Sequence, residues 1–246
     1  MKTVVLIPAR YQSSRFPGKP LVPLLGKPMV LWVAELSAKA VGQENVYVAT
    51  EDTRIFDVVE SAGFQALMTT NKALTGTDRL AIASDQIEAD IYINVQGDEP
   101  LVNPKDILKI RDKKIEQLEA VIIGYSWISN SEDEKSVKIP KVVTNEANKL
   151  VYMSRRVLPG FKEAKNAPNQ YKKVVCIYAF TKEELYAFKK FGRKSQLEHS
   201  EDIEILRFLE LDKSIIMVET EGGSLAVDIP SDIVPVEAAL KRVHGL

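Results

Sequence analysis

A basic loop near the amino terminus carries the side chains best suited to chemistry. Residues 7–21 read IPARYQSSRFPGKPL and follow the apolar run 3–7, which predicts a buried strand. The loop places the cations Arg10, Arg15 and Lys19 among serines and a glycine. With backbone N–H groups at the end of a strand, they suit a polyanion such as a nucleoside triphosphate. The Walker pattern is absent, and a solvated basic surface loop is the alternative.

Two aspartates are candidates for a metal site. Asp98 follows the predicted strand 90–96 in the segment VQGDEP, and ligands of open α/β sheets bind beyond the carboxyl ends of the strands. A carboxylate that faces the basic loop is suited to Mg²⁺, which takes one or two protein carboxylates and fills its shell with water and phosphate oxygens. Asp228 lies between a strand-like run and a helix start, where it is a plausible second ligand. A turn role for Asp98 and a helix-start role for Asp228 are the alternatives.

A small-residue turn and an acidic segment complete the set of candidates. Residues 75–79, TGTDR, begin a predicted helix. Their hydroxyl, N–H and guanidinium groups could bind a nucleotide base or a phosphate. Simple N-capping by Thr77 is the alternative. Acidic residues around the start of the predicted helix 200–210 complement its dipole, so their default role is structural. His199 favours a surface position, and Cys176 favours packing in an apolar strand.

Composition narrows the function classes. The 246 residues carry 33 Lys and Arg against 34 Asp and Glu, so no global field favours nucleic acid or a membrane surface as a partner. One cysteine excludes an internal disulfide framework and a multi-thiolate metal site. The apolar run at the amino terminus is too short for a signal peptide or a membrane span. We expect a soluble cytoplasmic protein with one domain over residues 1–246.

The elements that must position these residues alternate in the first half of the chain. A helix starting at Pro28 and those over 53–62, 77–87 and 103–118 are predicted between the strands 3–7, 46–50, 66–68 and 90–96. This alternation predicts right-handed βαβ units and a three-layer α/β fold with a largely parallel sheet.

After residue 120 the pattern changes. Strands are predicted at 121–127, 138–143, 149–153, 173–180 and 214–219, and the polar stretch 160–171 is predicted to be a mobile loop. Helices are predicted from Thr181, over 200–210, and from Ser231 with Ile233, Val236, Leu240 and Val243 on one face. Such a run of strands usually pairs antiparallel. Residues 120–180 either extend the same sheet or form an arm that packs on a second subunit.

The motifs taken together resemble one family over residues 3–243. The segments are 7–21, 76–80 (GTDRL), 95–100 (VQGDEP), 197–207 (LEHSEDIEILR) and 227–233 (VDIPSDI). They closely resemble the 3-deoxy-manno-octulosonate (Kdo) cytidylyltransferases, or CMP-Kdo synthetases. The resemblance implies a Rossmann-like nucleotidyltransferase fold and a homodimer, with 120–180 as a sugar-binding and dimerisation subregion.

The resemblance also implies a reaction. The hydroxyl on the anomeric carbon of a 3-deoxy-ulosonic acid attacks the α-phosphate of CTP, with Mg²⁺ as cofactor. Pyrophosphate leaves, and the CMP-sugar serves lipopolysaccharide or capsule synthesis.

Residue roles carry over from the same resemblance. The nucleotide-binding residues would be Pro8, Ala9, Arg10, Ser13, Arg15, Lys19, Thr75, Gly76, Arg79 and Gly97. The sugar-binding residues would be Gln96, Arg155, Tyr178 and Glu204, with Arg155 suited to the sugar carboxylate. Asp98 and Asp228 would bind the metal, and Lys19, Arg10 and Asp98 would be catalytic.

The chain departs from the family mainly at positions expected to bind sugar. The chain has Ala73-Leu74-Thr75 where the family has the start of a His-x-Ser-Gly-Thr turn. Val174 replaces the His of a His-x-Gly-Ile-Tyr strand, and Ile205 replaces a Gln. Losing polar partners shifts selectivity between substrates. A modified sugar acid is therefore one hypothesis. Another nucleotidyltransferase (sialic-acid-type or aminosugar) and a catalytically quiet nucleotide-binding homologue are the others.

Overall fold

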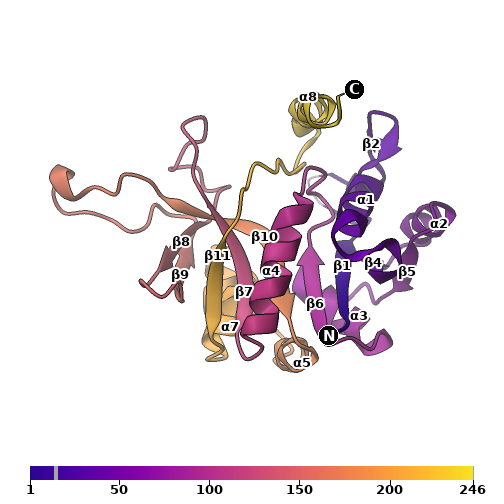
Figure 1. Cartoon of the computed structure of the whole chain (residues 1–246), viewed down its shortest axis with the longest axis horizontal. Helices are drawn as coiled ribbons and strands as arrows, with labels where there is room; N and C mark the ends of the chain where they lie inside the picture. Colours follow the sequence, from indigo (N-terminus) through magenta and orange to yellow (C-terminus); the bar gives the residue numbers. More distant parts are fainter. Residues whose placement is uncertain (14–15, 246) are drawn as a thin grey trace.

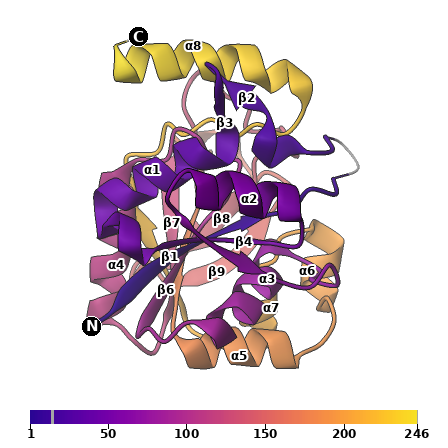
Figure 2. The same cartoon turned by 90° about the vertical axis from the view of Figure 1, so that its right-hand side faces the viewer.

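A mixed β-sheet crosses the molecule, and helices cover both of its faces (Figures 1 and 2). The computed structural model describes residues 1–13 and 16–245, so the prediction for Arg15 lies outside the described residues. The strand order is β11-β7-β10-β6-β1-β4-β5. These strands are β1 (Thr3–Ala9), β4 (Val46–Thr50), β5 (Gln65–Met68), β6 (Ile91–Val95), β7 (Val121–Trp127), β10 (Lys172–Phe180) and β11 (Ile215–Glu219).

The side chains of β1 show why the sheet needs two helical layers. Val4 and Leu6 enter one apolar cluster, whereas Val5 and Ile7 enter another on the opposite face, because successive side chains of a strand point to opposite sides. The helices α1 (Met29–Val41), α2 (Thr53–Ser61) and α4 (Pro104–Glu116) cover the face of Val5. The helices α3 (Gly76–Ala83), α5 (Lys182–Lys190), α6 (Gln196–Glu201) and α7 (Leu206–Glu210) cover the other. The predicted three-layer α/β fold is confirmed.

One antiparallel strand joins the two parallel parts of the sheet. β6, β1, β4 and β5 pair in parallel, as do β7 and β11, and β10 pairs antiparallel with both β6 and β7. Residues 121–127 and 172–180 therefore extend the main sheet. Two further strands, β8 (Lys141–Thr144) and β9 (Leu150–Ser154), continue from the start of β10 at the left of Figure 1, and their buried side chains Val142 and Met153 join the same cluster as α7.

A separate apolar cluster anchors the carboxyl-terminal helix. The hairpin β2 (Pro23–Leu24) and β3 (Lys27–Pro28) packs with α8 (Ile233–His244) through Leu24, Trp32 and Leu240. The Trp32 indole N–H donates to Leu24 O (3.0 Å). The sequence analysis did not predict this hairpin, because two-residue strands carry no detectable period. It ties the chain just after the basic loop to the segment just after Asp228.

Two helix predictions need correction. The helix predicted over 200–210 is two helices, since Asp202 has a left-handed backbone (φ 50°), which a right-handed helix excludes. Arg155 donates to the Glu201 and Asp202 carbonyl oxygens (2.5 and 2.8 Å) and so satisfies the end of α6. Val243 was predicted on the buried face of α8 but is 68% exposed, because the last turn extends beyond the buried Leu240.

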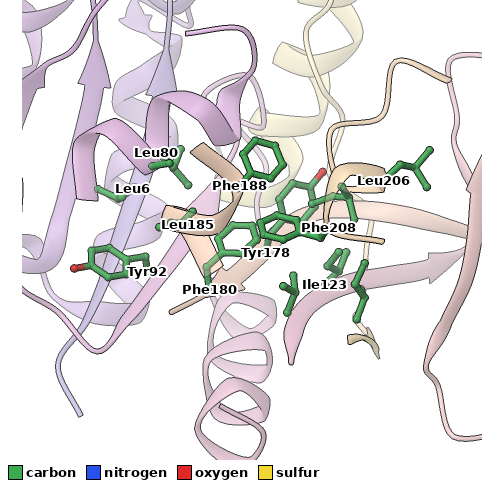
Figure 3. Close-up of a cluster of buried hydrophobic side chains, with 14 of the residues drawn as sticks. Leu6, Leu80, Tyr92, Ile123, Tyr178, Phe180, Leu185, Phe188, Leu206 and Phe208 are labelled. Atoms are coloured by element: carbon green, nitrogen blue, oxygen red, sulfur yellow. The ribbon is translucent and has the colours of Figure 1, made fainter. Parts of the chain in front are cut away.

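Three phenylalanines form the centre of the larger cluster (Figure 3). Phe208 of α7 stacks on Phe180 of β10 with ring centroids 5.1 Å apart and meets Phe188 of α5 at 4.7 Å. All three are fully buried. This stack fixes α7, and with it the segment that precedes α7, against the sheet.

Replacing the central ring should cost much of the stability. Phe208→Ala removes a fully buried ring, and we expect the free energy of unfolding to fall by about 3–5 kcal/mol. Phe161→Ala, at a ring that is 52% exposed, is the matched control and should change it by less than about 0.5 kcal/mol. Urea unfolding of both variants measures the difference, and equal midpoints would contradict the role of the stack.

Candidate active site

The site forms where β1 and β6 end side by side. A Cβ atom on Gly97 would lie 2.8 Å from the Pro8 carbonyl oxygen, so only glycine allows the segments that follow the two strands to approach so closely. The basic loop after β1 and the acidic turn after β6 therefore meet at the carboxyl edge of the parallel strands, where α/β sheets bind their ligands.

Lys19 brings the two predicted metal ligands together. Its ammonium nitrogen lies 2.6 Å from Asp98 Oδ2 and 3.8 Å from Asp228 Oδ1. The side chains of Lys19, Asp98 and Asp228 are 16%, 27% and 37% exposed, so solvent screens their charges in part. The backbone supports this arrangement, since Val227 N–H donates to Asp98 O (3.0 Å) and Asp228 N–H donates to Asp232 Oδ2 (2.8 Å).

The donor set fits a magnesium ion that arrives with phosphates. Two carboxylates that reach one ammonium can also share one cation, and Mg²⁺ usually takes no more than two protein carboxylates. Within residues 1–13 and 16–245, no three or more His, Cys, Asp or Glu side chains are grouped to hold a metal by themselves. Burial, and then the nearby charge of Asp98, raise the pKa of Glu99 to about 7. A buried carboxyl group beside a second carboxylate, such as Glu99 beside Asp98, would be stabilised by a bound cation.

A cavity of about 340 Å³ opens beside Lys19. Every nucleotide-binding residue predicted from the sequence lines it, apart from Arg15, which lies outside the described residues. The cavity also reaches Gln96, Asp98, Glu204 and Asp228, and it includes Lys194, Glu198 and Asp202, to which the sequence analysis gave no ligand role. Residues from β1, α3, the end of β6 and the α6–α7 segment therefore surround one space.

Hydrogen bonds and an ion pair hold the turn at residues 75–79 in place. Thr75 is the N-cap of α3 and accepts from Asp78 N–H (3.1 Å), so the alternative that named Thr77 as the cap is wrong. Arg79 is 5% exposed, pairs with Glu51 (2.9 Å) and donates to Thr69 Oγ1 (2.5 Å). Burial lowers the pKa of Arg79. Its guanidinium therefore braces the cavity wall at the same time as it lines the cavity.

A buried charge network joins the α3 wall to the α6–α7 wall. The fully buried Arg207 guanidinium pairs with Asp78 (2.7 Å) and with Glu198 (2.6 Å). Glu204 accepts from Thr77 N–H (2.9 Å) and from the Gln96 amide (3.1 Å), and burial raises the pKa of its carboxyl group. The positions of Gln96 and Glu204, predicted as sugar ligands, therefore depend on contacts between distant segments.

A second cavity of about 820 Å³ continues from the first. The two share Arg10, Gln96, Asp98, Asp202, Glu204 and Asp228. The second is also lined by the two remaining residues predicted to bind sugar, Arg155 and Tyr178. Ile205 lies in the fully buried core and does not line it.

The sequence analysis missed some of the residues that line the second cavity. Lys173 lies inside the predicted strand 173–180 and pairs with Glu132. A lysine within an apolar strand was the available signal, since such a charge needs a partner or a ligand. Lys138, at the start of the predicted strand 138–143, carried the same signal. Ile203 carried none, because only the path of the chain after α6 brings it to the cavity.

Comparisons with known proteins agree with this geometry. A family model described as Cytidylyltransferase matches residues 4–215. The chain is 39% identical to an 8-amino-3,8-dideoxy-manno-octulosonate cytidylyltransferase of Shewanella frigidimarina and 40% identical to a 3-deoxy-manno-octulosonate cytidylyltransferase of Geobacter metallireducens, over 98% of this chain and 99% of each relative. A solved CMP:2-keto-3-deoxy-manno-octonic acid synthetase complexed with CTP superposes with a TM-score of 0.91 at 36% identity, over 99% of this chain and 100% of that one.

The buried charge network allows a direct test. Arg207→Met leaves Asp78 and Glu198 as buried carboxylates without their cation, and we expect the free energy of unfolding to fall by about 3–5 kcal/mol. Arg242→Met, at an exposed position of α8, is the matched control and should have little effect. Thermal and urea unfolding measure both, and a loss no greater than that of the control would show that the network does not hold the two walls.

Proposed function

The chain belongs to the cytidylyltransferase family, and we propose that it couples CTP to Kdo or a closely related 3-deoxy-ulosonic acid. The products would be pyrophosphate and a CMP-sugar for lipopolysaccharide or capsule synthesis. The printed names of the full-length relatives, at 39% and 40% identity, support both the nucleotide and the sugar class.

One observation carries the proposal. Lys19 lies between Asp98 and Asp228, and both carboxylates line both cavities. A nucleotide in the first cavity and a sugar acid in the second would therefore meet at this charged junction. Arg10 lines both cavities as well, which suits a phosphate that contacts both substrates.

The roles proposed for the residues follow from their places. Lys19, Arg10 and Ser13 would bind phosphate oxygens and neutralise the charge that grows as the α-phosphate is attacked. Gln96 and Glu204 would orient the sugar hydroxyl groups through hydrogen bonds. Asp98 and Asp228 would hold Mg²⁺, which supplies a Lewis acid that lowers the pKa of the attacking hydroxyl and clamps phosphate oxygens.

Pyrophosphate release from CTP and Kdo tests the reaction. Asp98→Ala removes a proposed metal ligand and should lower kcat at least ~100-fold. Asp57→Ala, at an exposed position of α2, is the matched control and should retain activity. Full activity in Asp98→Ala would exclude the proposed metal role. CTP binding without turnover of any sugar acid would indicate a quiet nucleotide-binding protein, and activity with another nucleotide or with sialic acids alone would favour the related enzymes.

We also propose that the protein is a cytoplasmic homodimer. Cytoplasmic location would follow from the use of CTP. Within the part of the chain described, none of the helices has both the length and the apolar character needed to cross a membrane. Exposed apolar side chains gather in the region around β8 and β9, with Trp127 at 39%, Val137 at 56% and Val151 at 54%. Such surfaces often contact another protein.

A charge on β9 should separate the proposed dimer. Val151→Glu places a carboxylate on this exposed strand, and we expect the particle mass in solution to fall from two chains to one. Val243→Glu, at an exposed valine of α8, should leave the mass unchanged. Light scattering after size-exclusion chromatography measures both, and a monomeric wild-type protein would overturn the proposal.

A further inference from the structure

The second cavity opens at a gap in the strand pairing of β10. Along one edge, β10 pairs with β8 over residues 172–173 and with β6 over residues 177–180. Residues 174–176 lie between these two stretches, and the Val174 N–H donates to the Pro140 carbonyl oxygen (3.2 Å). The register against β7 also shifts between Val175 and Tyr178, and such bulges re-aim side chains beside binding sites.

The side chains at this gap form an apolar wall. Val174 and Cys176 pack against the same cluster as Ile203, and all three line the cavity. Ile203 is 7% exposed. Burial raises the pKa of the Cys176 thiol and of the Tyr178 hydroxyl, as expected where little water enters. A thiol is only a weak hydrogen-bond donor, so this wall offers a ligand little polar recognition.

Two of the cations that line this cavity, Arg155 and Lys173, are already engaged. The Arg155 guanidinium donates to the carbonyl oxygens of Val137, Glu201 and Asp202. Lys173 pairs with Glu132. A sugar hydroxyl laid against Val174 and Cys176 would lose its water without gaining a hydrogen-bond partner, which is unfavourable. A free ammonium group would also lose its water there, and the negative charges of Glu99, Asp98 and Glu204, which reach Cys176, would offset part of that cost without making the wall itself polar.

We propose that the sugar acid used by this protein presents an apolar group, in place of one hydroxyl, to the wall formed by Val174, Cys176 and Ile203. This inference rests on the proposed function. The second cavity, at about 820 Å³ against about 340 Å³ for the first, has room for a group larger than a hydroxyl. The methyl end of an acylamino substituent is both apolar and larger than a hydroxyl. A deoxygenated carbon is apolar but adds no bulk.

A panel of substrates tests the inference with the wild-type protein. The acids are Kdo and analogues in which one hydroxyl at a time is replaced by hydrogen, ammonium or acetamido. We expect one acetamido or deoxy acid to exceed Kdo in kcat/KM by at least ~10-fold. Kdo or a free-amine acid as the best substrate would overturn the inference and leave the proposed function intact. No turnover of any acid would instead contradict the proposed function.

A nearly isosteric variant tests the wall itself. Val174→Thr adds one hydroxyl at the gap, and we expect the ratio of kcat/KM for Kdo to that for the preferred acid to rise by ~10-fold. The KM for CTP should not change, which separates a specificity role from a general structural defect. Val234→Thr, at an exposed valine of α8, is the matched control. An unchanged ratio in Val174→Thr would overturn the role of this wall.

Discussion

The attraction between one ammonium group and two carboxylates organises this protein. Lys19, from the loop after the first strand, reaches Asp98 after β6 and Asp228 ahead of α8. Three segments from different parts of the chain converge on this point, and both cavities open from it. Charges of both signs in a partly buried site are costly unless each has a partner. The same arrangement would suit the substrate that we propose, which brings anionic phosphates and a divalent cation.

The surrounding fold holds that junction from both sides. Gly97 lets the ends of β1 and β6 approach, so Asp98 can face the basic loop. The hairpin β2–β3 and the helix α8 share one small core, which keeps the segment of Asp228 beside the segment that follows Lys19. On the other side, Arg207 links α3 to the α6–α7 wall through two buried ion pairs. Each support is remote in sequence from the groups that it positions.

The two sides of the site differ in character. The side proposed for the nucleotide is built from strand ends and a capped turn, and its residues follow the family motifs closely. The side proposed for the sugar is built around a gap in the pairing of β10. Arg155, which the family resemblance assigns to the sugar carboxylate, also holds the end of α6 through the Glu201 and Asp202 carbonyl groups. The family likeness therefore accounts for the reaction better than for the choice of sugar.

Local patterns in the sequence determined the helices and the longer strands of the first half, the three-layer α/β class and the types of residue at the site. Apolar runs and capping depend on neighbours in the chain, so the buried strand over 3–7 and the helix start at Asn103 before Pro104 could be predicted directly. Only the tertiary structure decided that Asp98 and Asp228 share Lys19, that β10 runs antiparallel inside the sheet, and that Asp202 interrupts a helix at the guanidinium of Arg155. Each of these results depends on contacts between segments far apart in the chain, and local propensity carries no information about such contacts.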